Sequence, residues 1–173
     1  AFNGLDALGI LRGEHAIYFA ANRGREPLFI YLIAVTVGVL GRTPGALRLA
    51  AAACGTLTVP ATYLMVRAWF NRRIAILSAA IIATTYWHVH LSRVGFRAVT
   101  LPLAIALAVW VSGRAYRSQR RGTWLLAGIL YGACFYTYVA ARFTPVVVLG
   151  VAVYLLSIGK KDRLWPGAAY FAA

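Results

Sequence analysis

Five long apolar runs, separated by basic residues or by proline and glycine breaks, limit what this chain can fold into. A membrane-spanning helix needs about 20 predominantly apolar residues, and the runs approach or exceed that length. Hydrophobic residues make up 61% of the 173 residues, charged residues make up 13%, and the mean hydropathy is +0.71. A soluble globular domain is less apolar than this. We therefore predict an all-α, polytopic transmembrane helical bundle with crossings at residues 46–70, 74–91, 98–113, 123–138 and 144–159.

Basic residues between the crossings give the expected orientation. They form three clusters, and two predicted crossings separate each cluster from the next, so all three share one face of the membrane. By the positive-inside rule this face is cytoplasmic. The net charge of +14 is then first a topology signal, and we expect no nucleic-acid partner. The clusters are Arg67, Arg72 and Arg73, then Arg114, Arg117, Arg120 and Arg121, then Lys160, Lys161 and Arg163.

A shorter apolar run, residues 28–40, precedes the first crossing. Its 13 residues make roughly 20 Å of helix, whereas the hydrocarbon core is about 30 Å thick. Gly41 and Pro44 break the run before the first crossing begins. We expect it to lie along the outer interface as a helix, which makes residues 1–45 an extracytoplasmic loop. Residues 164–173 read as the start of a further helix, and we expect the chain to be a fragment of a longer multi-pass protein.

Eight arginines remain on the predicted outer face, where a topology signal alone predicts few. Guanidinium is always charged and binds phosphate oxygens with two parallel hydrogen bonds. Only Asp6, Glu14 and Glu26 are available there to balance the charge. The outer face therefore indicates an anion site, and snorkelling to lipid headgroups is the alternative role for any single arginine. The eight are Arg12, Arg23, Arg25, Arg42, Arg48, Arg93, Arg97 and Arg142.

Several stretches in this order resemble one family. They read AFNGLDALGILRG, GREPLFIYL, ALRLAAAACGTLTVPATYLMVRAWFNRR, SRVGFR and YTYVAAR. The chain is similar in these to the N-terminal half of the C-type membrane glycosyltransferases, in the bacterial branch related to protein O-mannosyltransferases and the lipid A aminoarabinose transferase. The resemblance implies a bacterial inner-membrane enzyme that takes sugar from a polyprenyl- or dolichyl-phosphate-linked donor on the extracytoplasmic side. The implied acceptor is a protein, a lipid or a glycan.

The resemblance also implies roles for particular residues. Arg25, two places before Pro27, matches the basic residue that holds the donor phosphate, and Glu26 becomes a candidate for catalysis, acceptor contact or binding a divalent metal ion. The acidic pair of the family falls just upstream of Ala1, so we expect the catalytic carboxylate there. Arg93, Arg97 and Arg142 are expected to support Arg25 at the phosphate.

Two further residues are candidate substrate contacts. His90 lies near the outer end of a predicted crossing; because His88 is only two positions away, the two histidines do not share a helix face and do not predict a metal site. Tyr138 could stack on a sugar ring, although aromatic residues at this depth are more often interfacial anchors.

Two other classes of protein remain open on the residues alone. A transporter of lipid-linked or anionic substrates would also carry arginines at the membrane, but it usually has internal repeats and helices broken in mid-membrane. Neither is evident in the sequence. A non-catalytic membrane subunit would explain the topology and leave the outer arginines without a role.

Overall fold

The computed structural model describes residues 2–14 and 26–157. Within those residues all regular secondary structure is helical, which confirms the predicted fold class. The elements in chain order are α1 (Phe2–Leu11), α2 (Leu28–Leu40), α3 (Pro44–Trp69), α4 (Arg72–Thr84), α5 (Tyr86–Val94), the 3-10 helix η1 (Arg97–Val99), α6 (Thr100–Ser118), α7 (Arg121–Cys134), the 3-10 helix η2 (Val139–Phe143) and α8 (Thr144–Ser157).

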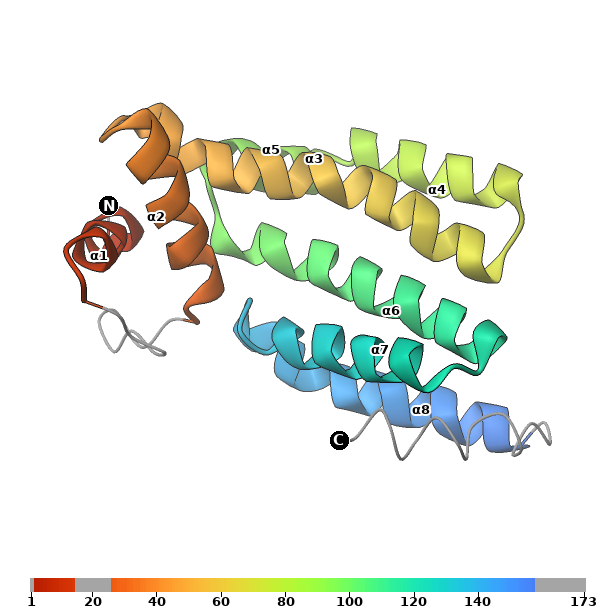
Figure 1. The fold of residues 1–173 in the computed structure, drawn as a ribbon. Helices are drawn as coiled ribbons and strands as arrows, with labels where there is room; N and C mark the ends of the chain where they lie inside the picture. The colour runs from red at the N-terminus through yellow and green to blue at the C-terminus, as the bar shows by residue number, and fades with distance from the viewer. Residues whose placement is uncertain (1, 15–25, 158–173) are drawn as a thin grey trace.

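Helix α2 lies across one end of the other long helices (Figure 1). It covers residues 28–40, as predicted, and begins at Leu28 after Pro27. One face, including Phe29, Ile30 and Ile33, is fully buried against α1 and α3. The opposite face leaves Val35 and Val39 exposed. A helix that lies crosswise with one apolar face exposed is suited to the position along the outer interface that we predicted.

Helix α3 is the central element, and small residues let other helices approach it closely. Its N-terminus is capped by Thr43, whose hydroxyl accepts from the Ala46 N–H at 3.1 Å, and Pro44 occupies the first turn. At Gly55 an added Cβ would lie 2.0 Å from Ser92 Oγ of α5. Helix α5 therefore packs on α3 at a distance that only glycine permits. The small buried residues of α3 are Ala46, Ala50, Ala51, Cys54, Gly55, Thr58, Ala61 and Ala68.

The crossing predicted at residues 74–91 is broken, which corrects the single helix expected from the sequence. Helices α4 and α5 meet at Thr85 and are bent by 52°. Thr85 has an extended backbone, φ −64° and ψ 119°, and its hydroxyl donates to the Ile81 carbonyl at 2.7 Å. A threonine side chain that bonds the preceding turn offers an alternative to the next helical turn. Nothing in the sequence indicated a broken helix, but the structure contains one at Thr85.

Among the described residues, two helical segments are long and apolar enough to cross a membrane by length and composition, α3 and residues 97–118, or three if the bent α4–α5 pair counts as one span. The segment 97–118 runs beyond the expected end at residue 113. Helix α7 ends at Cys134, before the predicted end of this crossing at residue 138. In the turn that follows, the Thr137 hydroxyl donates to the Cys134 carbonyl. Helices α7 and α8 have 14 residues each, or about 21 Å. Five crossings stay a prediction.

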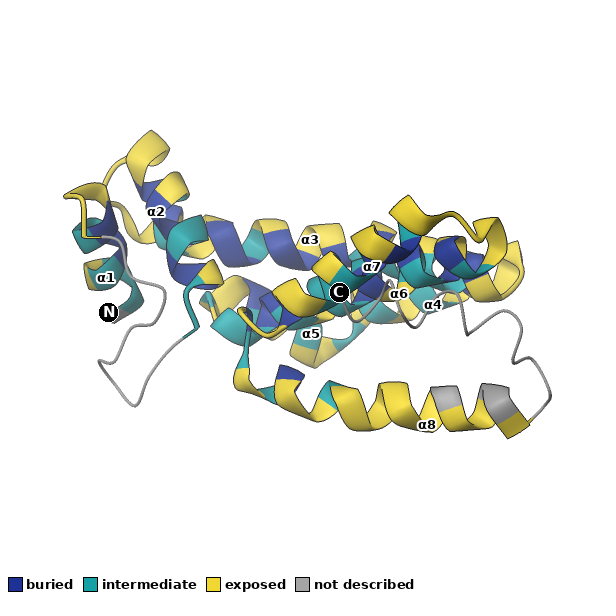
Figure 2. Cartoon of the chain, turned by 60° about the horizontal axis from the view of Figure 1, so that its bottom comes forward, coloured by how far each residue is buried: buried dark blue, intermediate teal, exposed yellow. Residues whose placement is uncertain are grey.

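Helix α8 carries an almost uniformly exposed apolar surface (Figure 2). Val146, Leu149 and Tyr154 are all more than 60% exposed. An apolar helix with so little protein contact is unsuited to water but suited to lipid or to other membrane helices. This exposure agrees with a protein of the membrane.

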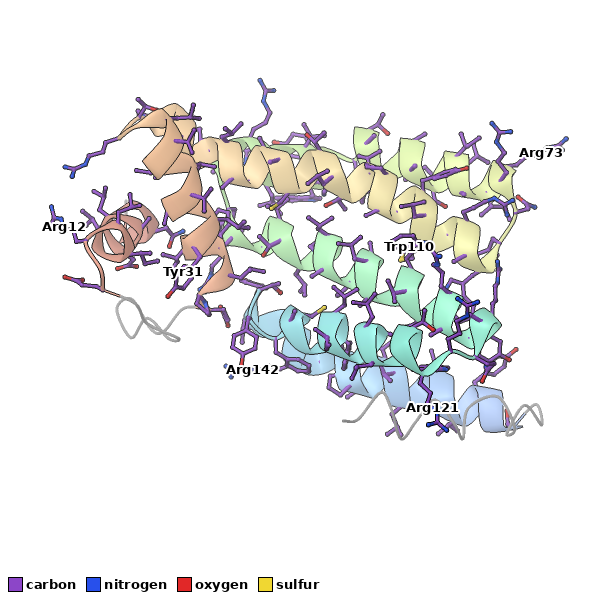
Figure 3. The ribbon with its side chains drawn as sticks, in the orientation of Figure 1. Arg12, Tyr31, Arg73, Trp110, Arg121 and Arg142 are labelled. Carbon is purple, nitrogen blue, oxygen red and sulfur yellow. The ribbon has the colours of Figure 1, made fainter. Side chains whose placement is uncertain are left out.

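Arginines gather at the two ends of the bundle, as the predicted clusters require. Figure 3 shows Arg73 and Arg121 at the end away from α1 and α2, and Arg12 and Arg142 at the end near them. The first two predicted basic clusters fall on the ends of α3 and α6 and the starts of α4 and α7, so they share one end. Lys160, Lys161 and Arg163 lie outside the described residues.

Replacing Gly55 by Ala should destabilise the protein by about 1–3 kcal/mol, because the new Cβ overlaps Ser92 Oγ and Cβ and the two helices must separate. The matched control is Gly132→Ala in α7, where an added Cβ meets no atom within 4 Å and a helix-favouring residue should not destabilise. Thermal unfolding in detergent measures both. Equal unfolding temperatures for the two variants would mean that α3 and α5 are not packed this closely.

The two ends should lie on opposite sides of the membrane. Gly24→Cys should react with an impermeant maleimide in intact cells, whereas Ser118→Cys, exposed at the end of α6, should react only after permeabilisation. The native Cys54 and Cys134 are buried, so the unmodified protein provides the background. Equal labelling of both positions in intact cells would refute the topology.

Candidate functional site

Three segments far apart in the sequence meet around the side chain of Arg97. Arg97 Nη1 donates to Glu26 Oε2 at 3.2 Å, across 71 positions of sequence. The guanidinium carbon of Arg97 also lies 5.4 Å from the centroid of the Tyr138 ring. The side chains of Arg97 and Glu26 are 24% and 13% exposed. We call Glu26, Arg97 and Tyr138 the outer cluster.

A glycine turn places Arg97 in the outer cluster. Helix α5 ends at Val94, and the next residue, Gly95, is left-handed with φ 81° and ψ 40°. The N–H groups of Gly95 and Phe96 both donate to the Leu91 carbonyl. This is the pattern in which glycine closes a helix and turns the chain. An added Cβ at Gly95 would also lie 3.7 Å from the backbone of Arg48 in α3. The turn therefore rests on the start of α3 and directs the chain into η1.

Backbone and ring contacts position the other two members of the outer cluster, Glu26 and Tyr138. Glu26 directly precedes Pro27 and the first turn of α2, and the Leu28 N–H donates to the Tyr136 carbonyl at 3.3 Å. That bond joins the start of α2 to the turn that follows α7. Tyr138 is extended, with φ −159°, and its ring packs on Phe96 with centroids 6.4 Å apart. Each partner of Arg97 is thus held by its own backbone context.

Arg97 is an oriented cation with unused hydrogen-bonding capacity. A guanidinium group has five N–H donors, and the hydrogen bond that the structure shows for this side chain uses one of them. The carboxylate on one edge and the aromatic face beside it restrict its rotamers and stabilise the charge. The remaining edge can receive an anion such as phosphate. Because Glu26 neutralises Arg97, net attraction for an anion requires another cation close by.

The predicted site residues are distributed as follows. Arg97, Glu26 and Tyr138 are brought together, although the sequence suggested neither the ion pair nor the part played by Phe96. Arg93 in α5 and Arg142 in η2 are exposed, and in the described part of the chain no carboxylate pairs with either. Arg142 lies at the same end of the bundle (Figure 3). Arg25, the leading candidate, lies outside the described residues, immediately before Glu26.

The two histidines have separate surroundings. His90 is exposed and stacks on Tyr86, with ring centroids 5.5 Å apart, and not on the outer cluster. His88 Nε2 donates to the Gly55 carbonyl at 3.0 Å and helps to hold α5 on α3. A contact of His90 with substrate stays a prediction.

In residues 2–14 and 26–157, Glu26 belongs to no cluster of three or more side chains that could hold a metal ion. No group of three or more histidine, cysteine, aspartate or glutamate side chains there is arranged to hold a metal ion. Glu26 instead binds Arg97. Binding of a metal ion by Glu26 stays a prediction.

Comparison with known proteins identifies the family. Residues 24–171 match the sequence profile of the dolichyl-phosphate-mannose-protein mannosyltransferases. The chain belongs to this family. Searches of curated proteins and of solved structures each return no significant match.

Family membership confirms the resemblance to the C-type membrane glycosyltransferases. The matched region begins at Gly24 and contains the whole outer cluster, together with Arg25, His90, Arg93 and Arg142. In general terms the protein is therefore a membrane glycosyltransferase, mannosyltransferase-like, of a family named for a lipid-phosphate-linked sugar donor. This favours an enzyme over the transporter and the non-catalytic subunit.

The Glu26–Arg97 pair should contribute to stability. Glu26→Gln keeps the shape of the side chain and leaves Arg97 largely buried without a counter-charge, so the free energy of unfolding should fall by about 1–3 kcal/mol. In a double-mutant cycle with Arg97→Gln the two changes should couple by about 0.5–3 kcal/mol. Glu14→Gln, an exposed carboxylate at the same end, is the control. Additive effects of Glu26→Gln and Arg97→Gln would contradict the pairing.

Proposed function

We propose that the chain is part of a multi-pass enzyme of the bacterial inner membrane that transfers sugar from a polyprenyl- or dolichyl-phosphate-linked donor. The acceptor is a hydroxyl of a protein, lipid or glycan on the extracytoplasmic side. The observation that carries the proposal is the outer cluster, where Glu26 and Tyr138 orient Arg97, and Arg25 directly precedes Glu26 in the sequence that matches the family. This cluster lies at the end of the bundle that α1 and α2 cover, which we assign to the extracytoplasmic side.

The reaction breaks the bond between the anomeric carbon and the phosphate oxygen. The acceptor oxygen bonds to the anomeric carbon, the lipid phosphate leaves with the electrons of the broken bond, and the hydroxyl proton passes to a base. Negative charge grows on the leaving phosphate during this step. Fixed cations in a poorly hydrated site stabilise the transition state more than the ground state.

In our proposal Arg25 and Arg97 contact the leaving phosphate. Arg25 adds the positive charge that the neutral Glu26–Arg97 pair lacks. Glu26 is proposed as a positioning residue, because its carboxylate holds Arg97, and the base is the carboxylate expected upstream of Ala1. Tyr138 offers an aromatic face at the same place, where a sugar ring can stack next to the guanidinium.

Arg93 and Arg142 have a weaker role in the proposal. Both are exposed at or near the same end, so they raise the local positive potential without a defined contact to the outer cluster. A positive potential at the mouth of a site attracts anionic substrates and is screened by salt. The proposal therefore places the catalytic requirement on Arg25 and Arg97.

Arg25→Ala and Arg97→Ala in the full-length protein should each lower sugar transfer by about 10²-fold or more, since loss of one preorganised stabilising donor typically has that effect. Arg25→Lys should retain part of the activity, because it keeps the charge and loses the two-pronged hydrogen bonding. Transfer from a polyprenyl-phosphate sugar in proteoliposomes is the measurement.

The matched control is Arg73→Ala, an exposed arginine at the opposite end, which should leave the rate unchanged. If a correctly inserted Arg25→Ala protein transfers sugar at the unmodified rate, the outer arginines are headgroup anchors and the proposal is wrong.

A further inference from the structure

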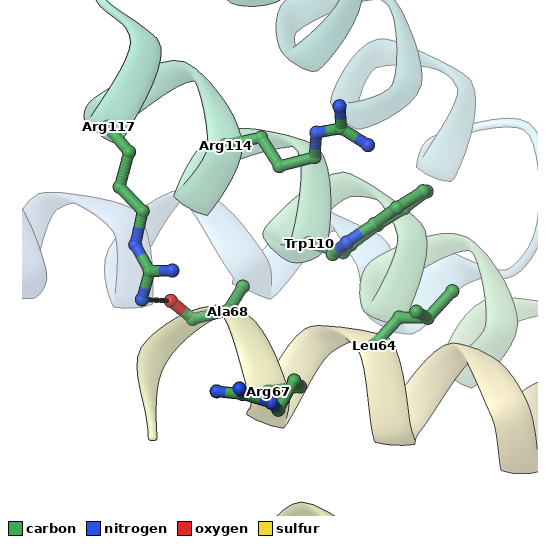
Figure 4. Close-up of a pocket in the computed structure, with 6 residues that line it drawn as sticks. All are labelled: Leu64, Arg67, Ala68, Trp110, Arg114 and Arg117. Carbon is green, nitrogen blue, oxygen red and sulfur yellow. Dashed lines mark hydrogen bonds between the residues drawn. The ribbon is translucent and has the colours of Figure 1, made fainter. Parts of the chain in front are cut away.

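A hollow of about 310 Å³ lies between α3 and α6, near the end of the bundle opposite the outer cluster (Figure 4). We call it the basic pocket. Three arginines line it, two from α6 and one from α3, together with an aromatic and two aliphatic side chains. Its lining residues are Leu64, Arg67, Ala68, Trp110, Arg114 and Arg117.

No carboxylate of the described chain balances the three charges of the basic pocket. The acidic residues that the structure describes are Asp6, Glu14 and Glu26, which all belong to α1 or to the segments that flank α1 and α2 at the other end. Like charges held together without a counter-ion repel one another. A bound anion would remove that repulsion.

The arginines are held in place and still have free donors. Arg117 Nη2 donates to the Ala68 carbonyl in the last turn of α3, shown as a dashed line in Figure 4. The guanidinium carbon of Arg114 lies 5.5 Å from the centroid of the Trp110 ring. Arg67 Nη1 reaches the Phe70 carbonyl at 3.5 Å, a long contact. The hydrogen bonds of Arg67 and Arg117 each use one of five donors, so an anion can still be bound.

The wall of the basic pocket changes from charged to apolar along the helices. Leu64 lies one turn before Arg67 and Ala68 in α3, and Trp110 lies one turn before Arg114 in α6, so both stand nearer the middle of the bundle. Close packing holds the two helices together here: an added Cβ at Gly113 would lie 3.1 Å from the Ala68 Cβ. A ligand with a charged group outward and an apolar part inward matches this arrangement.

We propose that the basic pocket binds a phosphate group through Arg67, Arg114 and Arg117. Arginine suits this role because its donors match phosphate oxygens, and a basic pocket between membrane helices suits a lipid headgroup. The phosphate comes either from an anionic phospholipid, whose chains would pass Leu64 and Trp110, or from a soluble phosphate compound. This site is independent of the proposed sugar transfer at the outer cluster.

The test measures binding to the purified full-length protein with three probes: dioctanoyl phosphatidylglycerol, dioctanoyl phosphatidylcholine and inorganic phosphate. Native mass spectrometry counts bound molecules and gives the affinity. We expect one saturable site that prefers phosphatidylglycerol to phosphatidylcholine. The double variant Arg67→Gln/Arg114→Gln should weaken this site by about 30-fold, since each arginine that contacts the phosphate directly is expected to contribute about a factor of five.

The matched control is Arg72→Gln/Arg73→Gln, which removes the same charge from the same end outside the basic pocket and should change the affinity less than twofold. Arg117 is left intact because it caps α3. Arg114→Lys keeps the charge and should weaken binding less than Arg114→Gln, and it keeps the test valid if the double variant does not fold.

The outcomes distinguish a lipid phosphate from a soluble phosphate, and two of them would contradict the proposal. Saturable binding of phosphatidylglycerol alone assigns the site to a lipid headgroup, and saturable binding of inorganic phosphate as well assigns it to the phosphate group itself. Equal weakening by the two double variants would show only a general attraction to a basic face. That result, or no saturable binding of any probe, would overturn the proposal.

Discussion

Both ends of the molecule depend on the close packing of other helices against α3. Its 26 residues make about 39 Å of helix, long enough to reach from the outer cluster to the basic pocket. Near its start the Gly95 turn rests on Arg48, and this contact sets where Arg97 begins η1. Near its end Ala68 faces Gly113 and receives the hydrogen bond of Arg117. Small side chains at these contacts allow approaches that larger ones would prevent.

The arginines at the two ends of the bundle have different partners. At the outer end a carboxylate and an aromatic ring hold one arginine, and the pair carries no net charge. At the other end the three arginines of the basic pocket contact helix carbonyls and a tryptophan, and no carboxylate of the described residues compensates their charge. Carbonyl groups at the end of a helix favour a cation but do not neutralise it. An oriented neutral pair suits a substrate that must come and go, whereas a group of arginines without a described carboxylate suits an anion that stays bound.

Some features could be predicted from residues alone because they depend on local chemistry. The apolar run at 28–40 is bounded by Pro27 and Gly41, so its helix has the expected ends. The break at Thr85 was not predicted, because the run from 74 to 91 is apolar on average and contains no proline or glycine. The break depends on hydrogen bonds from the hydroxyls of Thr84 and Thr85 to the carbonyls of Ala80 and Ile81. The early end of α7 has the same cause at Thr137. A single polar side chain that bonds the backbone hardly changes the mean hydropathy of a run, so hydropathy does not show where such a side chain ends a helix.

The sequence by itself determined that this is an all-helical protein of the membrane with basic residues segregated to its ends. Composition and the spacing of apolar runs decide which backbone structure can be satisfied without water. Which of the arginines would find a carboxylate was decided only by tertiary structure. Arg97 and Glu26 are 71 positions apart, and nothing in the sequence suggested that they pair with each other. An ion pair requires two side chains within hydrogen-bonding distance, and that distance follows from how the Gly95 turn, α2 and η2 pack together.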